Sequence, residues 1–449
     1  MKGSAKAALA AALLVVFMVT AASSVSVDVG SANLQSWRIA TAGEPWLEDV
    51  DLDELGYETS TQGIWLGTNS DGHLVVYRSP GAVAGAVPAY LLAAESPAAF
   101  SVLPASLLAA LLTWLSVLLL WGAVRPRLGE AWATIAAGVL ALGTPVWSVA
   151  ADSFWPHTLT VLGIAGMAWA ASRDRWLLVG ILGGVGLCGR LHLAVAVAVV
   201  GVAMGLARRD ARVTALVAAG SLPFVGLCAA WSRWLYGQWD PAGGYSQVDA
   251  YASRAVAREA DMQLLNPLGL LLSPDRGLLV WTPVLLVLGL ACIRSWRHQP
   301  DWSRALFLAG VTYTIVQNFM NVFHGGDNFY GYRLMLEILV CSFPLLAHSI
   351  CWTGSRARRY AGGVTALMVG MIALGAVTDS PGIGQDVVWT SNAFVIELQQ
   401  RPWLLPLWLL VGCAGVIAGR VVGARWGPPS RVIPAEGASS RDGVEEPSR

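Results

Sequence analysis

Residues Trp176–Leu206 read WLLVGILGGVGLCGRLHLAVAVAVVGVAMGL, an apolar stretch that only Arg190 and His192 interrupt. A transmembrane helix needs about 20 apolar residues, so the stretch is long for one helix and short for two. Arginines flank it on both sides, in Arg173–Arg175 and Arg208–Arg212. A single helix would place these clusters on opposite sides of a membrane, whereas basic loops tend to stay cytoplasmic. We therefore predict two short helices that turn near Arg190 on the external side.

The composition of the whole chain is that of a membrane protein. Of its 449 residues, 55% are apolar and 13% are charged, whereas soluble proteins have roughly 45–50% and about 25%. The 29 basic and 29 acidic residues cancel, so no net charge points to nucleic acid. A water-soluble enzyme and a nucleic-acid-binding protein are excluded. The six cysteines lie in apolar runs without CxxC spacing, which indicates small buried side chains.

Ten further apolar runs, together with Trp176–Leu206, predict an all-α polytopic membrane protein with about twelve transmembrane helices. The five short loops predicted to be cytoplasmic carry thirteen arginines, and this places both termini in the cytoplasm and the chain in the plasma membrane. The first run is expected to stay as a helix, with a cleaved signal peptide as the alternative. The runs are Ala7–Val25, Phe100–Val124, Glu130–Ala151, Trp155–Ser172, Val213–Tyr236, Leu278–Ile293, Arg304–Phe323, Arg333–Trp352, Tyr360–Val377 and Pro402–Gly419.

The polar residues gather on the predicted external side, in Asp28–Pro80, Gly237–Gly277 and Asp379–Arg401. The cytoplasmic loops are too short to fold into a catalytic domain, so any chemistry is expected outside. In the first external loop, Asp71-Gly72 predicts a tight turn between strand-like pieces at Ile64–Gly67 and His73–Tyr77. Ser79–Ala94 is apolar but short, and predicts an interfacial or re-entrant helix.

Three regions follow from this organisation. Residues 1–352 form the predicted transmembrane core, including the external loops 28–80 and 237–277. Residues 353–425 supply additional C-terminal transmembrane helices. Residues 426–449 are rich in Pro, Gly, Ser and charge, and we predict a disordered cytoplasmic tail.

The first external loop carries an unusual density of carboxylates. Solvation of an exposed loop explains such a cluster as well as catalysis does, so both interpretations stay open. The seven carboxylates are Glu44, Glu48, Asp49, Asp51, Asp53, Glu54 and Glu58.

Two polar turns lie beside predicted helix ends. Ala151–His157 places Asp152 and His157 near hydrocarbon, where an ionisable group is costly and suggests function; helix capping and an interfacial position are the alternatives. In Leu272–Leu278, Arg276 stands where a guanidinium can meet a phosphate. Its alternative is snorkelling toward lipid headgroups.

A third stretch, His324–Arg333, combines three glycines with aromatic residues. Tyr330 and Tyr332 offer stacking surfaces suited to a sugar. Arg333 begins the next predicted helix, a position that the helix dipole disfavours for a cation. We therefore expect an anionic ligand there, or a paired carboxylate such as Glu337.

In their order along the chain these segments resemble the GT-C glycosyltransferases, in particular bacterial members related to protein O-mannosyltransferases and aminoarabinose transferases. The likeness covers most of Met1–Trp352. It implies transfer of a sugar from a polyprenyl-phosphate carrier to an acceptor hydroxyl, with inversion, next to membrane lipid. The segments that carry it are Gly43-Glu44-Pro45-Trp46, Asp71-Gly72-His73, Tyr77-Arg78-Ser79-Pro80-Gly81, Ser273-Pro274-Asp275-Arg276-Gly277 and Tyr330-Gly331-Tyr332-Arg333.

The resemblance also implies roles for individual residues. By position, Glu44 is the catalytic carboxylate and Asp152 a second one. Gly43-Glu44-Pro45 lacks the aspartate that commonly precedes this carboxylate in the family, so Glu48 and Asp49 stand as substitutes. Arg333 and Arg276 would hold the leaving phosphate. The remaining implied substrate contacts are Tyr330, Tyr332, Trp155 and His157.

Two alternatives and several details stay open at the level of sequence. A transporter or flippase of a lipid-linked sugar would place ionisable groups near the midplane, and Arg190 and His192 alone approach that pattern. A non-catalytic GT-C homologue is the other alternative, because of the missing aspartate. Asp49 and Asp51 can bind a divalent cation through oxygen, and no other cofactor is expected. The sugar, the acceptor and the oligomeric state are not encoded in any motif.

Overall fold

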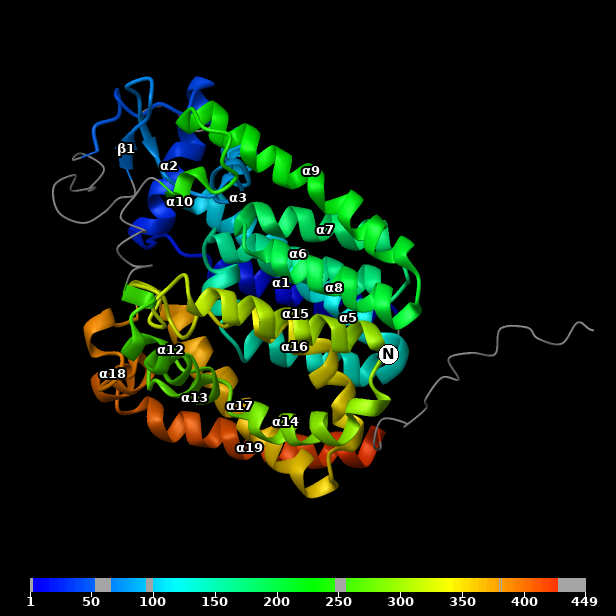
Figure 1. The fold of residues 1–449 in the computed structure, drawn as a ribbon. Helices are drawn as coiled ribbons and strands as arrows, with labels where there is room; N and C mark the ends of the chain where they lie inside the picture. The colour runs from blue at the N-terminus through cyan, green and yellow to red at the C-terminus, as the bar shows by residue number, and fades with distance from the viewer. Residues whose placement is uncertain are drawn as a thin grey trace, which may run out of the picture.

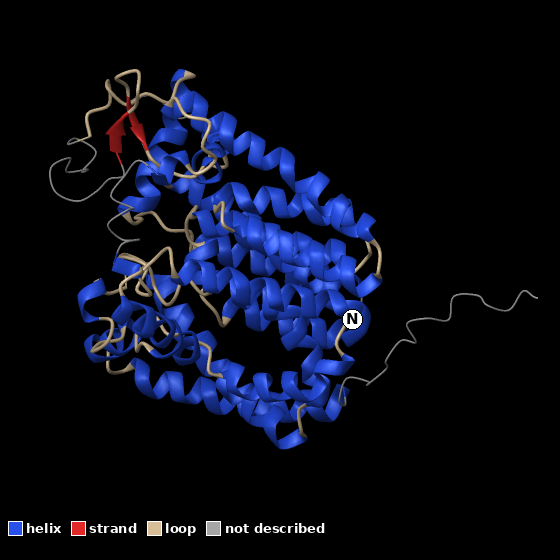
Figure 2. Ribbon diagram, viewed as in Figure 1, coloured by secondary structure: helices blue, strands red, loops and turns tan. Residues whose placement is uncertain are grey.

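The computed structural model describes residues 3–52, 66–93, 100–246, 256–378, 380 and 382–426. The described chain is mostly helical, with one small sheet at one end of the molecule (Figures 1 and 2). The predicted tail, Asp53, Glu54, Glu58 and Asp379 lie outside the described residues. The all-α class predicted from the apolar runs is confirmed.

Four helices in the described part of the chain are long and apolar enough to cross a membrane. They are α5 (Leu103–Leu142), α9 (Ala211–Tyr236), α17 (Ser355–Thr378) and α19 (Leu404–Trp426). Shorter apolar helices accompany them, including α1 (Gly3–Val19), α7 (Trp176–Gly189) and α8 (Leu193–Arg208). These observations support a membrane protein, and the total of about twelve spans stays a prediction.

The remaining helices complete the bundle and the end of the molecule that carries the sheet. The helices of the bundle are α6 (Pro156–Ala171), α14 (Val284–Ser295), α15 (Asp301–Asn318) and α16 (Leu336–Ser349), with a π-helix at Val146–Ala151. Short helices follow in the loops: α10 (Gly243–Ser246), α12 (Ala260–Leu272), α13 (Leu278–Trp281) and α18 (Ala393–Gln400). Single turns of 3-10 helix lie at Trp296–His298, Ile350–Trp352 and Gln385–Val387.

Helix α5 is two helices joined at Gly129. Its backbone there has φ 72° and ψ 166°, a conformation outside the helical region that glycine adopts without steric cost. The indole Nε1 of Trp121 donates to Thr134 Oγ1 at 3.2 Å, so the two halves fold back on each other. This break matches the two predicted runs Phe100–Val124 and Glu130–Ala151.

Several of the predicted cytoplasmic segments meet at one end of the bundle. Lys6, in the first helix, forms an ion pair with Glu130. Arg127 Nη2 donates to the His298 carbonyl at 2.9 Å. Such clustering is what the arginine distribution predicts, because loops on one side of a membrane must share one end of the bundle.

The stretch Trp176–Leu206 forms two helices, as predicted. Helix α7 ends at Gly189, Arg190 has an extended backbone, and α8 begins at Leu193. Glycines allow α7 to pack closely on α6: a Cβ built on Gly163 would lie 2.6 Å from Gly186 Cα. Small residues at a crossing are a common means of association for helices in a bilayer.

The first external loop contains both helix and strand. Helix α2 (Val27–Ala42) follows α1, and strands β1 (Leu66–Thr68) and β2 (Leu74–Val76) pair antiparallel around the predicted turn at Gly72. The apolar segment after it forms two short helices, α3 (Pro80–Ala84) and α4 (Val87–Ala93), instead of a span. The described residues of this loop contain the predicted hairpin, and its place on the external side stays a prediction.

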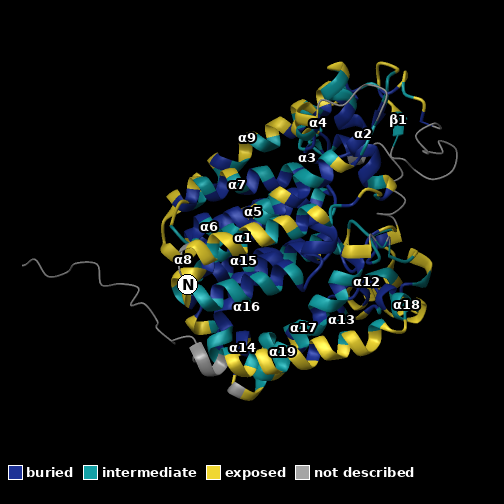
Figure 3. Ribbon diagram, turned by 180° about the vertical axis from the view of Figure 1, so that it is seen from behind, coloured by how far each residue is buried: buried dark blue, intermediate teal, exposed yellow. Residues whose placement is uncertain are grey.

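The residues in the interior of the bundle are buried, and exposed residues lie on the outward faces of its helices (Figure 3). Leu206, Ile293 and Leu410 expose 75%, 75% and 65% of their area on the outside of helices. Water would penalise this arrangement, whereas lipid chains would not. Both the exposed leucines and the length of the helices therefore fit a bilayer.

Candidate functional site

A polar cavity of about 400 Å³ lies where several helix ends meet. Helices α6 and α8 direct their N-termini into it, through Trp155–His157 and Arg190–His192. Helix N-termini favour negative charge. The cavity is lined by Asp28, Arg78, Trp155, Pro156, His157, Arg190, Leu191, His192, Ala242, Met320, Asn321, Val322, His324, Gly325, Gly326, Arg333 and Gln385.

Two arginines converge on one carboxylate in this cavity. Asp28 Oδ1 accepts a hydrogen bond from Arg78 Nη2 at 2.5 Å, and Asp28 Oδ2 accepts from both Nη atoms of Arg333 at 3.3 Å. Asp28 lies in the first turn of α2, and Arg78 is the second residue after strand β2. The Tyr236 hydroxyl holds this strand exit by donating to the Val76 carbonyl at 3.0 Å. The result is a carboxylate between two guanidiniums that come from distant parts of the chain.

Aromatic rings hold Arg333 from the other side. Its guanidinium lies over the rings of Trp155 and Phe329, 4.6 and 5.1 Å from their centroids. Burial, together with the neighbouring Arg190 and Arg78, lowers the pKa of Arg333 to about 10, although Asp28 opposes this shift. Arg333 is therefore charged at neutral pH, and a second anion beside it would relieve the repulsion among the three arginines.

A buried polar network forms the wall behind Arg190. His157 Nδ1 and Glu337 Oε1 lie 2.7 Å apart, and Thr160 Oγ1 donates to the same oxygen at 2.8 Å. Arg190 Nη1 lies 3.0 Å from His157 Nε2. Glu337 thus pairs with His157, and Arg333 pairs with Asp28. Of the two expectations for Arg333, the structure gives a paired carboxylate, but a different one from Glu337.

Two further histidines line the cavity. His192 Nε2 lies 2.8 Å from Gln317 Oε1, and the His192 ring stacks on Tyr313. Burial, with Arg276 and Arg333 nearby, lowers the pKa of His324 to about 4. His324 is therefore neutral at pH 7 and adds polar atoms without adding positive charge.

A second, smaller cavity of about 170 Å³ shares Trp155 with the first. Asp152 and Tyr330 line it, so the structure brings these two predicted residues together with Trp155. Ser148, in the same lining, donates to the Tyr330 carbonyl at 2.7 Å. The lining is Ser24, Val25, Ser26, Ser148, Asp152, Ser153, Trp155, Asn328, Phe329, Tyr330 and Ser380, a mixture of hydroxyls and aromatic faces.

Of the predicted carboxylates of the first loop, the described ones, Glu44, Glu48, Asp49 and Asp51, line neither cavity. Arg38, on α2, pairs with Glu44 at 3.2 Å and with Asp49 at 3.3 Å, and it donates to the Trp46 carbonyl. These contacts fold the segment back along α2 and leave 47% of the Glu44 side chain exposed. Glu48 instead contacts His73 Nδ1 and Leu74 N, both at 2.9 Å.

Two other predicted substrate contacts are buried away from the cavities. Arg276 is 1% exposed and donates to the carbonyls of Phe329, Gly331 and Ile383 at 3.0, 3.1 and 2.8 Å. It therefore fastens loops together instead of lying at a mouth. The Tyr332 hydroxyl lies 2.7 Å from Thr282 Oγ1 in the core.

Three charged residues of the larger cavity have no role assigned from the sequence: Asp28, Arg78 and Arg190. A signal for Asp28 was available, because it is the first carboxylate after the first apolar run, where an ionisable group is costly. Arg78 lies in one of the segments that resemble the GT-C family, but the resemblance implies no role for this residue. The sequence predicts a turn at Arg190, and the backbone turns there, but the prediction gives no contact for the Arg190 side chain.

The described residues contain no group of three or more His, Cys, Asp and Glu side chains arranged to hold a metal ion. Asp49, one of the two carboxylates considered for a cation, is occupied with Arg38. The charge that faces the larger cavity comes mainly from guanidinium groups.

No protein-family model and no curated protein sequence matches the chain. A solved structure does match its fold: the crystal structure of ArnT from Cupriavidus metallidurans bound to undecaprenyl phosphate, with a TM-score of 0.50 and 17% sequence identity. The match covers 94% of this chain and 76% of the ArnT chain. The chain therefore has a GT-C-like fold, the fold that the sequence resemblance predicted.

Proposed function

We propose that this chain is a multi-pass membrane glycosyltransferase that moves a sugar from a polyprenyl-phosphate donor to an acceptor hydroxyl. The observation that carries the proposal is the convergence of Arg78 and Arg333 on Asp28 in a cavity at the ends of membrane helices. The ArnT structure of the same fold binds undecaprenyl phosphate. Guanidinium groups suit phosphate because their paired N–H donors match its oxygens.

The phosphate of the donor would bind at Arg333 and Arg78. In the free protein these two arginines share the Asp28 carboxylate. We infer that an incoming phosphate replaces Asp28 as their partner, and the released carboxylate then faces the acceptor. Arg190 adds a third positive charge to the lining.

The reaction then needs one proton transfer and one displacement. The Asp28 carboxylate takes the proton from the acceptor hydroxyl as the new bond forms between its oxygen and the anomeric carbon. The bond from that carbon to the phosphate oxygen breaks, and polyprenyl phosphate leaves with the electron pair. Arg333 and Arg78 stabilise the charge that develops on the leaving oxygen. Attack opposite the leaving group inverts the anomeric carbon.

The smaller cavity would hold the sugar or the acceptor. Trp155 and Tyr330 offer aromatic faces, and the serines offer hydroxyl groups. Asp152 would orient a hydroxyl there as the second carboxylate of the site. We propose Asp28 as the base in place of Glu44, because Glu44 lies outside both cavities.

In this proposal the reaction faces the external side, and both termini are cytoplasmic, as the arginine distribution predicts. The proposed reaction uses only groups of the chain.

Release of polyprenyl phosphate tests the function without knowledge of the acceptor. The purified protein in lipid nanodiscs is incubated with polyprenyl-phosphate-linked hexoses and pentoses and with a cell-envelope extract. Mass spectrometry follows the released polyprenyl phosphate and the glycosylated product. We expect release with at least one donor, and its loss in Arg333→Ala. Failure to bind undecaprenyl phosphate, together with counterflow of a sugar in proteoliposomes, would show a transporter instead.

A further inference from the structure

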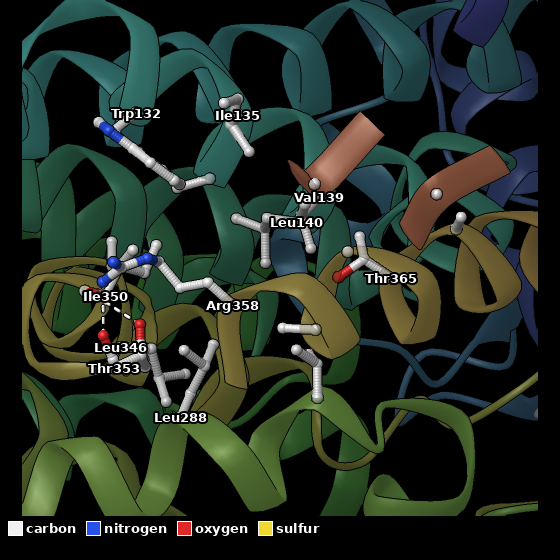
Figure 4. Close-up of a pocket in the computed structure, with 18 of the residues that line it drawn as sticks. Trp132, Ile135, Val139, Leu140, Leu288, Leu346, Ile350, Thr353, Arg358 and Thr365 are labelled. Atoms are coloured by element: carbon white, nitrogen blue, oxygen red, sulfur yellow. Dashed lines mark hydrogen bonds between the residues drawn. The ribbon is translucent and has the colours of Figure 1, made fainter. Parts of the chain in front are cut away.

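An apolar pocket of about 610 Å³ lies between α5, α14, α16, α17 and α19, and it shares no lining residue with the two polar cavities (Figure 4). Its size falls in the range of roughly 300–1,000 Å³ that is typical of ligand sites. Leu140, Leu288 and Phe343 supply apolar wall from three of the helices. Glycines bring α17 and α19 close together on another side: a Cβ built on Gly362 would lie 2.8 Å from the Gly415 carbonyl oxygen.

Positive charge gathers at one end of this pocket. Arg358, Arg359 and Arg420 line it, and none of the described lining residues is an aspartate or a glutamate. Figure 4 shows Trp132, Ile350, Thr353 and Arg358 at the same end, with Val139 and Thr365 farther along. Arg358 donates to the Thr353 carbonyl. A guanidinium carries five N–H donors, so most of its donors remain for a ligand.

A polar atom at this end also lacks a partner. The indole Nε1 of Trp132 is buried and has no hydrogen-bond acceptor among the described residues. A buried donor without an acceptor costs roughly 1–3 kcal/mol. A ligand oxygen that reaches this end of the pocket would supply an acceptor.

We propose that the pocket binds an anionic glycerophospholipid, with an acyl chain between the helices and the phosphate at Arg358 and Arg359. In hydrocarbon the pocket cannot be filled by water at low cost, so a lipid chain is its natural occupant. Arg358 and Arg359 belong to the loop predicted to be cytoplasmic, where anionic lipids and basic pockets between helices meet. The lipid would tie the C-terminal helices α17 and α19 to the core helices α5 and α16.

The position of the arginines distinguishes this lipid from the polyprenyl donor. Helix α16 separates Arg333, before its start, from Thr353 and Arg358, beyond its end. At about 1.5 Å per residue its 14 residues span roughly 21 Å. A carrier with its phosphate on Arg333 would bring only hydrocarbon to Arg358, which would leave the guanidinium groups without an anion. The inference therefore does not depend on the proposed transferase activity.

Native mass spectrometry of the full-length protein in detergent provides the test. The protein is titrated with phosphatidylglycerol and with phosphatidylcholine of the same chain length. We expect at least tenfold tighter binding of phosphatidylglycerol, and loss of that preference in the double variant R358Q/R359Q. The matched double variant R294Q/R297Q removes two exposed arginines of another predicted cytoplasmic loop that do not line the pocket, and it should keep the preference.

A second variant separates the pocket from the charges. Thr365→Phe fills the pocket while all arginines remain, and it should weaken phosphatidylglycerol binding even if R358Q/R359Q does not fold. Equal binding of both lipids by the natural chain, or equal loss in R294Q/R297Q, would overturn the inference. The inference would also be overturned if undecaprenyl phosphate displaced phosphatidylglycerol and itself no longer bound to R358Q/R359Q. Retained undecaprenyl phosphate binding in that variant is the result that supports two separate sites.

Discussion

Replacement of Asp28 by asparagine should separate binding of the donor phosphate from turnover. The side chain keeps its size but loses its charge, and Arg78 and Arg333 lose the carboxylate that they share. If Asp28 is the general base, asparagine cannot take the acceptor proton. General-base catalysis contributes typically 10²–10⁴-fold, so the rate of polyprenyl phosphate release should fall by about two to four orders of magnitude.

Binding should change in the opposite direction. A phosphate near both arginines would lie roughly 6 Å from the carboxylate, and at an effective dielectric constant of about 20 the repulsion is on the order of 3 kcal/mol. The cavity is partly open to water, so we expect about a third of this value to remain. A gain of about 1 kcal/mol corresponds to roughly fivefold tighter binding of undecaprenyl phosphate.

Native mass spectrometry gives the Kd for undecaprenyl phosphate, and product release in nanodiscs gives the rate. Glu44→Gln tests the competing carboxylate, and we expect it to leave both values unchanged, because Arg38 holds Glu44 outside the cavities. The reasoning is refuted if Asp28→Asn keeps its rate within about threefold of the natural chain, since a positioned base contributes far more than this. It is also refuted if Glu44→Gln abolishes release while Asp28→Asn does not.

Four further outcomes are expected. Glu337→Gln should lower the Tm in detergent, because removing one partner of a buried pair costs about 3–5 kcal/mol, and an unchanged Tm would mean that His157 has another partner. Arg276→Lys should also lower the Tm, since lysine lacks the planar fork that reaches three carbonyls, but the folded variant should still bind undecaprenyl phosphate. The pKa of His324 is lowered from 6.5 to about 4, so between these values the unfolded chain binds a proton that the folded chain does not. The free energy of unfolding is therefore unaffected by His324 above pH 6.5 and decreases as the pH drops toward 4. The Tm measured across this range should fall less steeply in His324→Gln than in the natural chain. Parallel Tm curves for the two proteins would contradict the assignment. Dialysis against EDTA should leave undecaprenyl phosphate binding unchanged because guanidinium groups supply the positive charge, and a weaker Kd would reveal a bound cation.

The helical architecture was predictable because it depends on local properties. Apolar runs and arginine positions predicted the break between α7 and α8 at Arg190, and the turn signal at Gly72 predicted the hairpin. These features follow from solvent and backbone geometry within a few dozen residues. The candidate site was less predictable, because Asp28 and Arg333 are 305 positions apart. No local pattern shows which of many carboxylates the fold brings to Arg333.

Density of charge also does not indicate which carboxylate lines the cavity. The acidic cluster around Glu48 and Asp49 drew the prediction, yet the carboxylate in the cavity is the isolated Asp28. An exposed loop tolerates many carboxylates at little cost, because water solvates each of them. A single carboxylate beside hydrocarbon has a larger free-energy cost, so its presence is a stronger indication of function.

Arg276 and Arg333 show why burial of an arginine is not by itself a sign of function. Arg276 is buried and Arg333 is largely so, and the guanidinium of each lies over the ring of Phe329. Arg276 donates hydrogen bonds to three main-chain carbonyls and forms an ion pair with Asp275, so all these contacts are made within the fold. Arg333 instead faces a cavity and shares one carboxylate with Arg78, while Arg190 lines the same space. Arg78 and Arg333 thus have one carboxylate between them, and an anionic ligand would meet complementary charge there. A phosphate at the membrane boundary is that anion in the proposed reaction, and its departure would restore the pairing of both arginines with Asp28.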